Sequence, residues 1–194
     1  WYGGGADFAD ATRPLTLTHN GNRIAFLGCN SSRAGVFASE TRPGAAPCYT
    51  SEQHALMVEQ VRTLREQGYL PIITLQQVET DQYVPPQEHL RDLRMYAEAG
   101  AVIAHGSQAH WVKPMEFHGE TFIHYGPGNF FFDQMWDEAV RQEFIMRYTF
   151  YEGRLLSIEM KTARLEEYGR PRPMTAAERA DFLTMMFALS PDSE

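Results

Sequence analysis

Two short apolar runs, at residues 70–75 and 101–104, constrain the fold more than any other feature of this sequence. Between them, leucine and tyrosine residues recur at helical spacing from residue 85 onward, and the pattern ends at Gly100. A strand, a helix and a second strand in this order predict a right-handed parallel crossover. Another helix, predicted over residues 51–68, precedes the first run. We therefore expect two βα units built around a parallel pair of strands.

The other apolar segments predict antiparallel hairpins. Asn20-Gly21 separates two apolar stretches, and this dipeptide is a strong hairpin signal. Two later hairpins are predicted from alternating segments at residues 115–117 and 121–125, and at residues 144–151 and 154–161. The first eleven residues contain three consecutive glycines, so we expect them to be too flexible for a helix or a central strand.

The end of the chain completes the predicted architecture. A last helix is expected over residues 175–188, and the polar, proline-containing residues 165–173 predict a surface linker before it. The 194 residues suit a single domain, residues 1–194. The predicted fold class is α/β: two βα units followed by antiparallel hairpins and a C-terminal helix. Two parallel strands plus hairpins would make a thin sheet, and its exposed edges would favour pairing with another chain.

Charge and composition exclude some classes of protein. The net charge of −8 argues against a nucleic-acid binder, which would present a basic face. The sequence has no run of about 18 apolar residues, so no transmembrane segment is predicted. Because the chain opens at Trp1 and not at Met, we expect a processed or truncated product.

Cys29 and Cys48 flank a loop rich in Gly, Ser and Pro. A disulfide across this loop would stabilise the fold by about 3 kcal/mol and would indicate an oxidising compartment. The alternative is two buried free thiols in a cytosolic protein. We favour the disulfide, because a long loop with little core of its own gains most from a covalent link.

Polar residues follow both apolar runs. Glu79 and Asp81 come after the first run, and His105 and His110 come after the second. Ligands of open α/β sheets bind outside the carboxyl ends of the strands, and neutral imidazole binds Zn, Mn or Fe well. These positions therefore predict a metal or substrate site. The alternatives are a solvated loop at residues 76–83 and one packed and one exposed histidine.

A third cluster, at residues 125–134, combines a Gly-x-Gly-Asn turn with Asn129, three phenylalanines and Asp133. The glycines predict an unusual backbone path that approaches another group closely. We expect Phe130 and Phe132 to pack in the core. The turn itself is harder to explain by packing alone, so Asn129 and Asp133 are candidate site residues.

Three segments carry a resemblance to a known family: residues 101–134, NGNRIAFLGCN at residues 20–30, and PGAAPC at residues 43–48. Together they resemble the CapA (poly-γ-glutamate capsule biosynthesis) family, over nearly the whole chain. The resemblance implies the C-terminal portion of a calcineurin-type metallophosphoesterase-like α/β/β/α sandwich with metal ligands at strand ends. It also implies export to an extracellular or cell-surface location and a role with anionic polymers such as poly-γ-glutamate.

The resemblance carries over to individual residues. Glu79 matches the glutamate of a family His…Glu-Tyr motif, but Leu75, Gln76 or Gln77 stands where the histidine is expected. The family pattern Gly-His-His-Pro-His is here Gly-Ser-Gln-Ala-His, which retains only His110. From the resemblance we expect this chain to lack the N-terminal half of the family domain, with its Asp strand and Asn-Glu pair. We expect Glu79 and His110 to be metal ligands only if a partner half supplies the rest of the site.

Two functions follow from the resemblance, with catalytic residues unknown in both. The first is a binding or assembly subunit with a degraded metal site, which takes an anionic polymer or glycan. The second is half of a metal-dependent hydrolase, using Mn, Zn or Fe and completed by a separate N-terminal chain. Expected partners are that N-terminal half, further copies of this chain, or both. The candidate pocket contains Glu79, Gln77, His105, Gln108, His110, Asn129 and Asp133.

Overall fold

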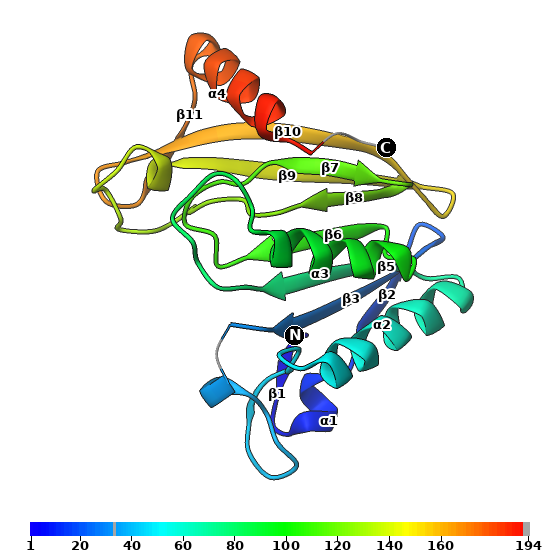
Figure 1. The fold of residues 1–194 in the computed structure, drawn as a ribbon. Helices are drawn as coiled ribbons and strands as arrows, with labels where there is room; N and C mark the ends of the chain where they lie inside the picture. The colour runs from blue at the N-terminus through cyan, green and yellow to red at the C-terminus, as the bar shows by residue number, and fades with distance from the viewer. Residues whose placement is uncertain (33, 192–194) are drawn as a thin grey trace.

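A computed structural model describes residues 1–32 and 34–191. The largest unit is a six-stranded sheet (Figure 1). Its strands, in spatial order, are β2 (Leu15–His19), β3 (Asn22–Asn30), β5 (Leu70–Gln76), β6 (Ile103–Ser107), β8 (Thr121–His124) and β7 (Met115–His118). The strands β3, β5, β6 and β8 are parallel, and the two edge strands are antiparallel to their neighbours.

The smaller elements complete the chain. A second sheet contains β9 (Gln142–Tyr151), β10 (Arg154–Glu166) and β11 (Arg170–Pro173), and a small ribbon pairs β1 (Gly4–Gly5) with β4 (Gly44–Ala45). The helices are α1 (Phe8–Ala11), α2 (Ser51–Glu66), α3 (Gln87–Glu98) and α4 (Ala176–Leu189), with short 3-10 turns η1 (Ala34–Val36) and η2 (Ala139–Arg141).

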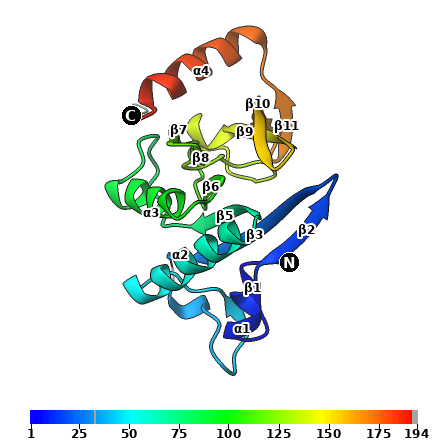
Figure 2. The ribbon, with the colours of Figure 1, turned by 90° about the vertical axis from the view of Figure 1, so that its right-hand side faces the viewer.

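The central strands of the six-stranded sheet bury residues on both faces, whereas the edge strand β2 is exposed along its length. Alternate residues of a strand point to opposite faces, so Ile73 packs under α2 and α3 while Ile72 packs toward the second sheet. Helix α4 adds Phe182 and Met186 to the second cluster. Figure 2 shows α2 and α3 on one side of the sheet, β9 to β11 on the other, and α4 beyond its β7 end. The predicted mixed α/β class with hairpins and a C-terminal helix is confirmed.

Local sequence explains where the main helices begin. The hydroxyl of Thr50 accepts the backbone N–H of Gln53 at the start of α2, and the side chain of Gln53 accepts the backbone N–H of Thr50, which together form a capping box. Thr175 and Glu178 form the same motif at the start of α4. None of the helices in the described part of the chain has the length and apolar character needed to span a bilayer.

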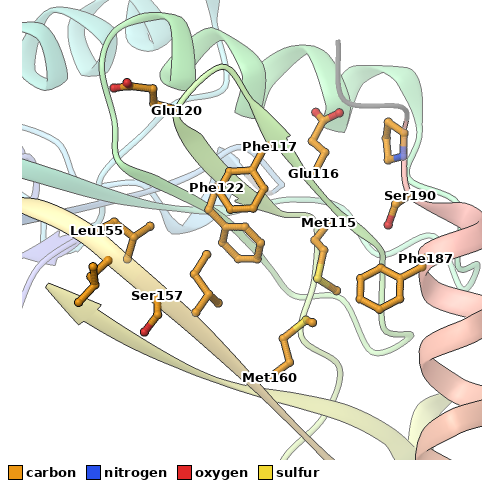
Figure 3. A pocket seen from close by; sticks show the side chains of 13 residues that line it. Met115, Glu116, Phe117, Glu120, Phe122, Leu155, Ser157, Met160, Phe187 and Ser190 are labelled. Carbon is orange, nitrogen blue, oxygen red and sulfur yellow. The ribbon is translucent and has the colours of Figure 1, made fainter.

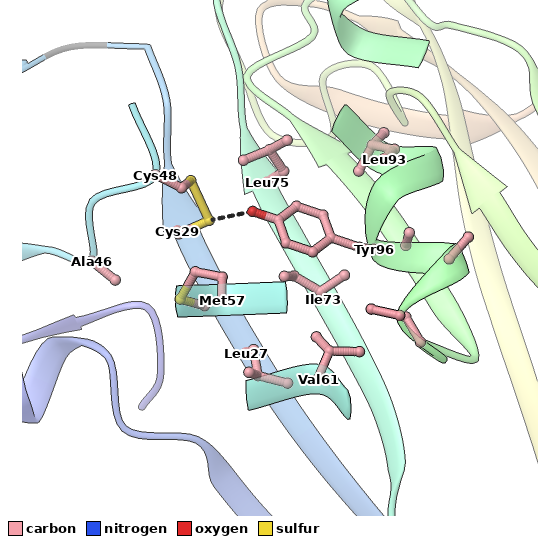
Figure 4. Close-up of a cluster of buried hydrophobic side chains, with 14 of the residues drawn as sticks. Leu27, Cys29, Ala46, Cys48, Met57, Val61, Ile73, Leu75, Leu93 and Tyr96 are labelled. Carbon is pink, nitrogen blue, oxygen red and sulfur yellow. Dashed lines mark hydrogen bonds between the residues drawn. A yellow bond between two sulfur atoms is a disulfide. The ribbon is translucent and has the colours of Figure 1, made fainter. Parts of the chain in front are cut away.

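The predicted disulfide is present, since Cys29 and Cys48 are bonded with their Cα atoms 5.7 Å apart. Both cysteines are buried in the cluster beneath α2 and α3 (Figure 4). The hydroxyl of Tyr96 lies 3.7 Å from Cys29 Sγ and 2.8 Å from Nδ1 of His54. The disulfide therefore closes the loop, and its contact with Tyr96 of α3 connects the end of β3 to the helix layer.

Three sequence predictions of the fold are wrong. The segment at residues 121–125 forms the expected hairpin but also pairs in parallel with β6. Strand β3 pairs in parallel with β5 as well, so the sheet has four parallel strands and not two. Residues 165–173 hold the end of β10, a turn and β11, and are not a linker, because Leu165 is fully buried and Arg172 pairs with acidic neighbours. The first eleven residues form β1 and α1, which Asp7 caps.

Candidate functional site

The carboxyl ends of three parallel strands bring polar residues together. Asn30 of β3 lies beside Gln76 of β5, and Gln76 lies beside Ser107 of β6. A cleft of about 220 Å³ opens over this row. Its lining residues are Tyr2, Gly3, Gly28, Cys29, Asn30, Ala45, Thr74, Gln76 and Ser107. The cleft therefore lies where open α/β sheets bind their ligands.

Hydrogen bonds fix the floor of this cleft. The hydroxyl of Ser107 donates to Gln76 Oε1 at 2.9 Å, and Gln76 Nε2 donates to Gln108 Oε1. The backbone N–H of Ser31 donates to the carbonyl of Gln76 at 2.8 Å. All of these side chains are uncharged, so the network presents amide and hydroxyl groups in a set orientation.

One wall of the cleft depends on a glycine. The ring of Tyr2 packs on Phe26 with centroids 5.6 Å apart and lies over Gly28. A Cβ at Gly28 would be 3.1 Å from this ring and 2.9 Å from Thr74 Oγ1. The aromatic wall and the Thr74 hydroxyl can approach each other because residue 28 has no side chain.

Glu79, His110 and Asn129 form a second group, in the segments that follow β5, β6 and β8. The backbone N–H of His110 donates to Glu79 Oε2, and His110 Nδ1 lies 2.7 Å from Asn129 Oδ1. An amide oxygen only accepts, so Nδ1 must carry the proton. Asn129 is held in turn by its own Nδ2, which donates to the carbonyl of Val140 at 2.9 Å.

Lys113 lies beneath the loop that carries Glu79. Its side chain is 1% exposed, and its ammonium donates to Thr80 Oγ1 at 3.0 Å and to the carbonyl of Gln82 at 2.7 Å. Oε1 of Glu79 is 3.8 Å from the ammonium. Burial lowers the pKa of Lys113, and the carboxylates of Glu79 and Asp81 oppose that shift.

These residues do not fit a divalent metal in this chain alone. Glu79 Oε1 accepts backbone N–H groups from Thr80 at 2.6 Å and Asp81 at 2.9 Å, Oε2 accepts from His110, and Lys113 faces the same carboxylate. Within residues 1–32 and 34–191, no group of three or more His, Cys, Asp or Glu side chains could hold a metal ion.

The structure separates the other predicted residues from this site. Gln77 is buried on the helix-covered side of the sheet, where its Oε1 would lie 3.3 Å from a Cβ at Gly106. His105 packs edge-on against His124 with ring centroids 5.0 Å apart, and burial lowers the pKa of both rings. Asp133 is exposed, and Gln108 is exposed but joins the amide network.

The three consecutive phenylalanines also differ from the prediction. Phe130 and Phe132 are each 42% exposed, so they are not core residues. Phe132 lies against His110 with ring centroids 5.2 Å apart. The loop that follows β8 is anchored through Asn129, which leaves these rings on its outer side.

A second groove, of about 420 Å³, lies away from this cleft (Figure 3). Its lining comes from four elements: β7, β8, β10 and the end of α4. Met115, Met160 and Phe187 point into it, and Glu116 at its side is already bonded to Arg94. Its lining offers few unengaged polar groups for a specific ligand. The strand-end cleft is therefore the better candidate site.

The sequence analysis did not identify Tyr2 and Thr74 of the cleft or Lys113 beside Glu79, and it named Gln76 only as one of three possible residues at the expected histidine position. Lys113 offered one signal, because a lysine followed by a proline interrupts an otherwise apolar segment. Tyr2 and Thr74 lie in the cleft only because of strand register and the fold of the N-terminal segment.

Comparison with known proteins places the chain in a family. Residues 1–134 match the family described as "Bacterial capsule synthesis protein PGA_cap". The PGA biosynthesis protein CapA of Bacillus subtilis (strain 168) is 31% identical over 138 residues, which cover 69% of this chain and 35% of that protein.

A solved structure, that of Haemophilus influenzae NAD nucleotidase (NadN), aligns with 90% of this chain and 36% of its own at a TM-score of 0.42 and 13% identity. The chain thus spans about a third of the length of each of these two proteins. The match over most of its length shows that the chain belongs to the PGA_cap family of bacterial capsule synthesis proteins.

Proposed function

We propose that this chain acts in capsule biosynthesis as a polymer-binding component at the cell surface. The observation that carries the proposal is the uncharged cleft at the strand ends, where Gln76 and Ser107 form a hydrogen-bonded floor and Gln108, outside the lining, bonds to Gln76. The similar Bacillus protein is named for PGA biosynthesis. The buried disulfide supports an oxidising, extracellular setting.

The chemistry of the cleft favours the backbone of an anionic polyamide over its carboxylates. Peptide-like groups offer one donor and one acceptor, which side-chain amides and hydroxyls match. The protein carries a net charge of −8, so a polyanion meets overall repulsion. Binding through neutral groups should therefore strengthen as added salt screens that repulsion.

The test is fluorescence anisotropy with labelled poly-γ-glutamate. Gln76→Ala removes the central side chain of the floor and should weaken binding roughly tenfold, the loss expected for one or two hydrogen bonds. Gln87→Ala, at an exposed position on α3, is the matched control and should bind as the wild type does. Equal affinity of both variants, or no binding by the wild type at any salt concentration, would refute the proposal.

A second function is favoured by one contact. Asn129 holds Nδ1 of His110, and histidine ligands of metals are commonly oriented through their other ring nitrogen. A hydrolase completed by a separate N-terminal chain would use His110 Nε2 in this way. That function requires stoichiometric divalent metal in the purified two-chain complex, and elemental analysis that finds none would exclude it.

A further inference from the structure

The cation nearest to Glu79 belongs to the protein itself. Lys113 is buried, and its ammonium is directed to three oxygens: Thr80 Oγ1, the carbonyl of Gln82 and, at 3.8 Å, Glu79 Oε1. An ammonium has three N–H donors: two are hydrogen-bonded here, and the charge is paired with Glu79. Burying a charge in this way is unfavourable unless it is paired and hydrogen-bonded, so the loop at residues 79–82 and the lysine stabilise each other.

The backbone holds the lysine in this position. The N–H of Lys113 donates to the carbonyl of Gly126 at 2.9 Å. A Cβ at Gly126 would lie 3.4 Å from Lys113 Cγ and 2.3 Å from the Cβ of Ala109. Glycine at residue 126 therefore leaves the space through which the lysine stem passes to the loop.

We propose that Lys113 is a built-in cation that takes the place of a divalent metal at Glu79. The tethered ammonium neutralises the carboxylate and orders the loop after β5, which are the tasks that a bound metal ion would perform there. The inference goes beyond polymer binding, since it concerns how the loop is held and which ions the site rejects.

The same geometry predicts rejection of divalent ions. Both oxygens of Glu79 already accept backbone N–H groups, from Thr80, Asp81 and His110. An ion that approached Glu79 Oε1 would meet the positive charge of Lys113, which is covalently attached and cannot diffuse away. A divalent ion bound to Glu79 would lie close to the Lys113 ammonium, and two positive charges that close repel strongly in a partly buried site.

The experiment is a titration with MnCl2 in which free Mn²⁺ is counted by electron paramagnetic resonance and the melting temperature is followed in parallel. Lys113→Ala removes the charge and leaves space. Lys161→Met changes the other lysine, which is exposed on β10, and is the matched control. The wild type and the control should bind no Mn²⁺ at this site.

The Lys113→Ala variant should melt at a lower temperature in EDTA and regain part of the loss with MnCl2. Its affinity for Mn²⁺ should exceed that of the wild type by at least about tenfold, because one like charge has been removed. Adding Glu79→Gln to this variant should abolish the gain. If Lys113→Ala is unfolded in EDTA, recovery of its circular dichroism on refolding with MnCl2 supports the inference.

Three results would overturn it. The first is stoichiometric Mn²⁺ binding by the wild type that Glu79→Gln abolishes. The second is a Lys113→Ala variant that binds no more Mn²⁺ than the wild type. The third is failure of that variant to fold in either buffer. No polymer is present in these measurements, so they can fail while anisotropy still shows polymer binding, and the reverse also holds.

Discussion

Glu143 gives the sharpest test of the energetics of this fold. It lies on β9, is 1% exposed, and neither carboxylate oxygen has a hydrogen-bond partner in the described part of the chain. Its backbone bridges to Gly128, which precedes Asn129 of the group formed by Glu79, His110 and Asn129. Burial raises the pKa of Glu143 to about 8. The folded protein therefore holds this carboxyl in its neutral form at neutral pH.

The sign of the pH dependence follows from the two pKa values of Glu143. The unfolded value is 4.5 and the folded value is about 8, so the folded state binds the proton more tightly. The contribution of Glu143 to stability is greatest below pH 4.5, the pKa of the unfolded state. It falls by about 1.4 kcal/mol per pH unit as the pH rises from there to the folded pKa of about 8. Between about pH 5 and pH 8 the full loss is about 4 kcal/mol, and we halve it to about 2 kcal/mol because buried carboxylates relax and admit water.

Glu143→Gln replaces the carboxyl with an amide of similar shape that does not ionise. Its stability should match the wild type in acid and exceed it by about 2 kcal/mol, or about 4–8 °C in Tm, at about pH 8. Thermal unfolding followed by circular dichroism across this pH range measures the difference. Glu120→Gln, at an exposed position, is the control. Parallel pH profiles for the wild type and Glu143→Gln would refute the reasoning.

Two further predictions concern the framework of the domain. Replacing Cys29 and Cys48 by serine, or reducing them, should lower the free energy of unfolding in urea by about 3 kcal/mol, since the bond closes a loop over a sequence separation of 19. An unchanged midpoint would show that the unfolded loop is already constrained. Arg94→Ala leaves the buried carboxylate of Glu116 without the guanidinium that bonds both of its oxygens at 2.7 Å, and should cost about 3 kcal/mol in the same assay. A loss below about 1 kcal/mol would contradict the burial of that charge.

Much of the fold could be predicted because its signals are local. The apolar run at residues 70–75 and the turn at Asn20-Gly21 each determine one element with little help from distant residues. The parallel pairing of β8 could not be predicted in this way, because a short apolar strand has the same pattern in a hairpin and in a parallel sheet. Strand β11 was missed because Arg170–Pro173 alternates Arg and Pro, and contacts of Arg172 with Glu166 and Glu178 stabilise it.

The sequence predicted which loops meet at the candidate site, but not which face of the sheet each side chain occupies. Residues after β5 and β6 must meet, because adjacent parallel strands end at the same edge, and Glu79 does bond to His110. The sequence could not decide between Gln76 and Gln77. Neighbouring residues of a strand point to opposite faces, so a shift of one position exchanges a cleft residue for a buried one. The register assigns Gln76 to the cleft and Gln77 to the side beneath the helices.

The loops that follow β5 and β6 connect the cleft to the site of Glu79 and Lys113. Gln76 joins these loops through Ser107 and Gln108, and Glu79 joins them again through His110. Each of these contacts is between groups of the chain itself, so the cleft is ordered before any ligand arrives, and binding then costs less conformational entropy. If Lys113 supplies the charge that holds Glu79, removing it should loosen both loops and weaken polymer binding as well, although Lys113 does not line the cleft. A Lys113→Ala variant that loses loop order but keeps full affinity for the polymer would separate the two proposals.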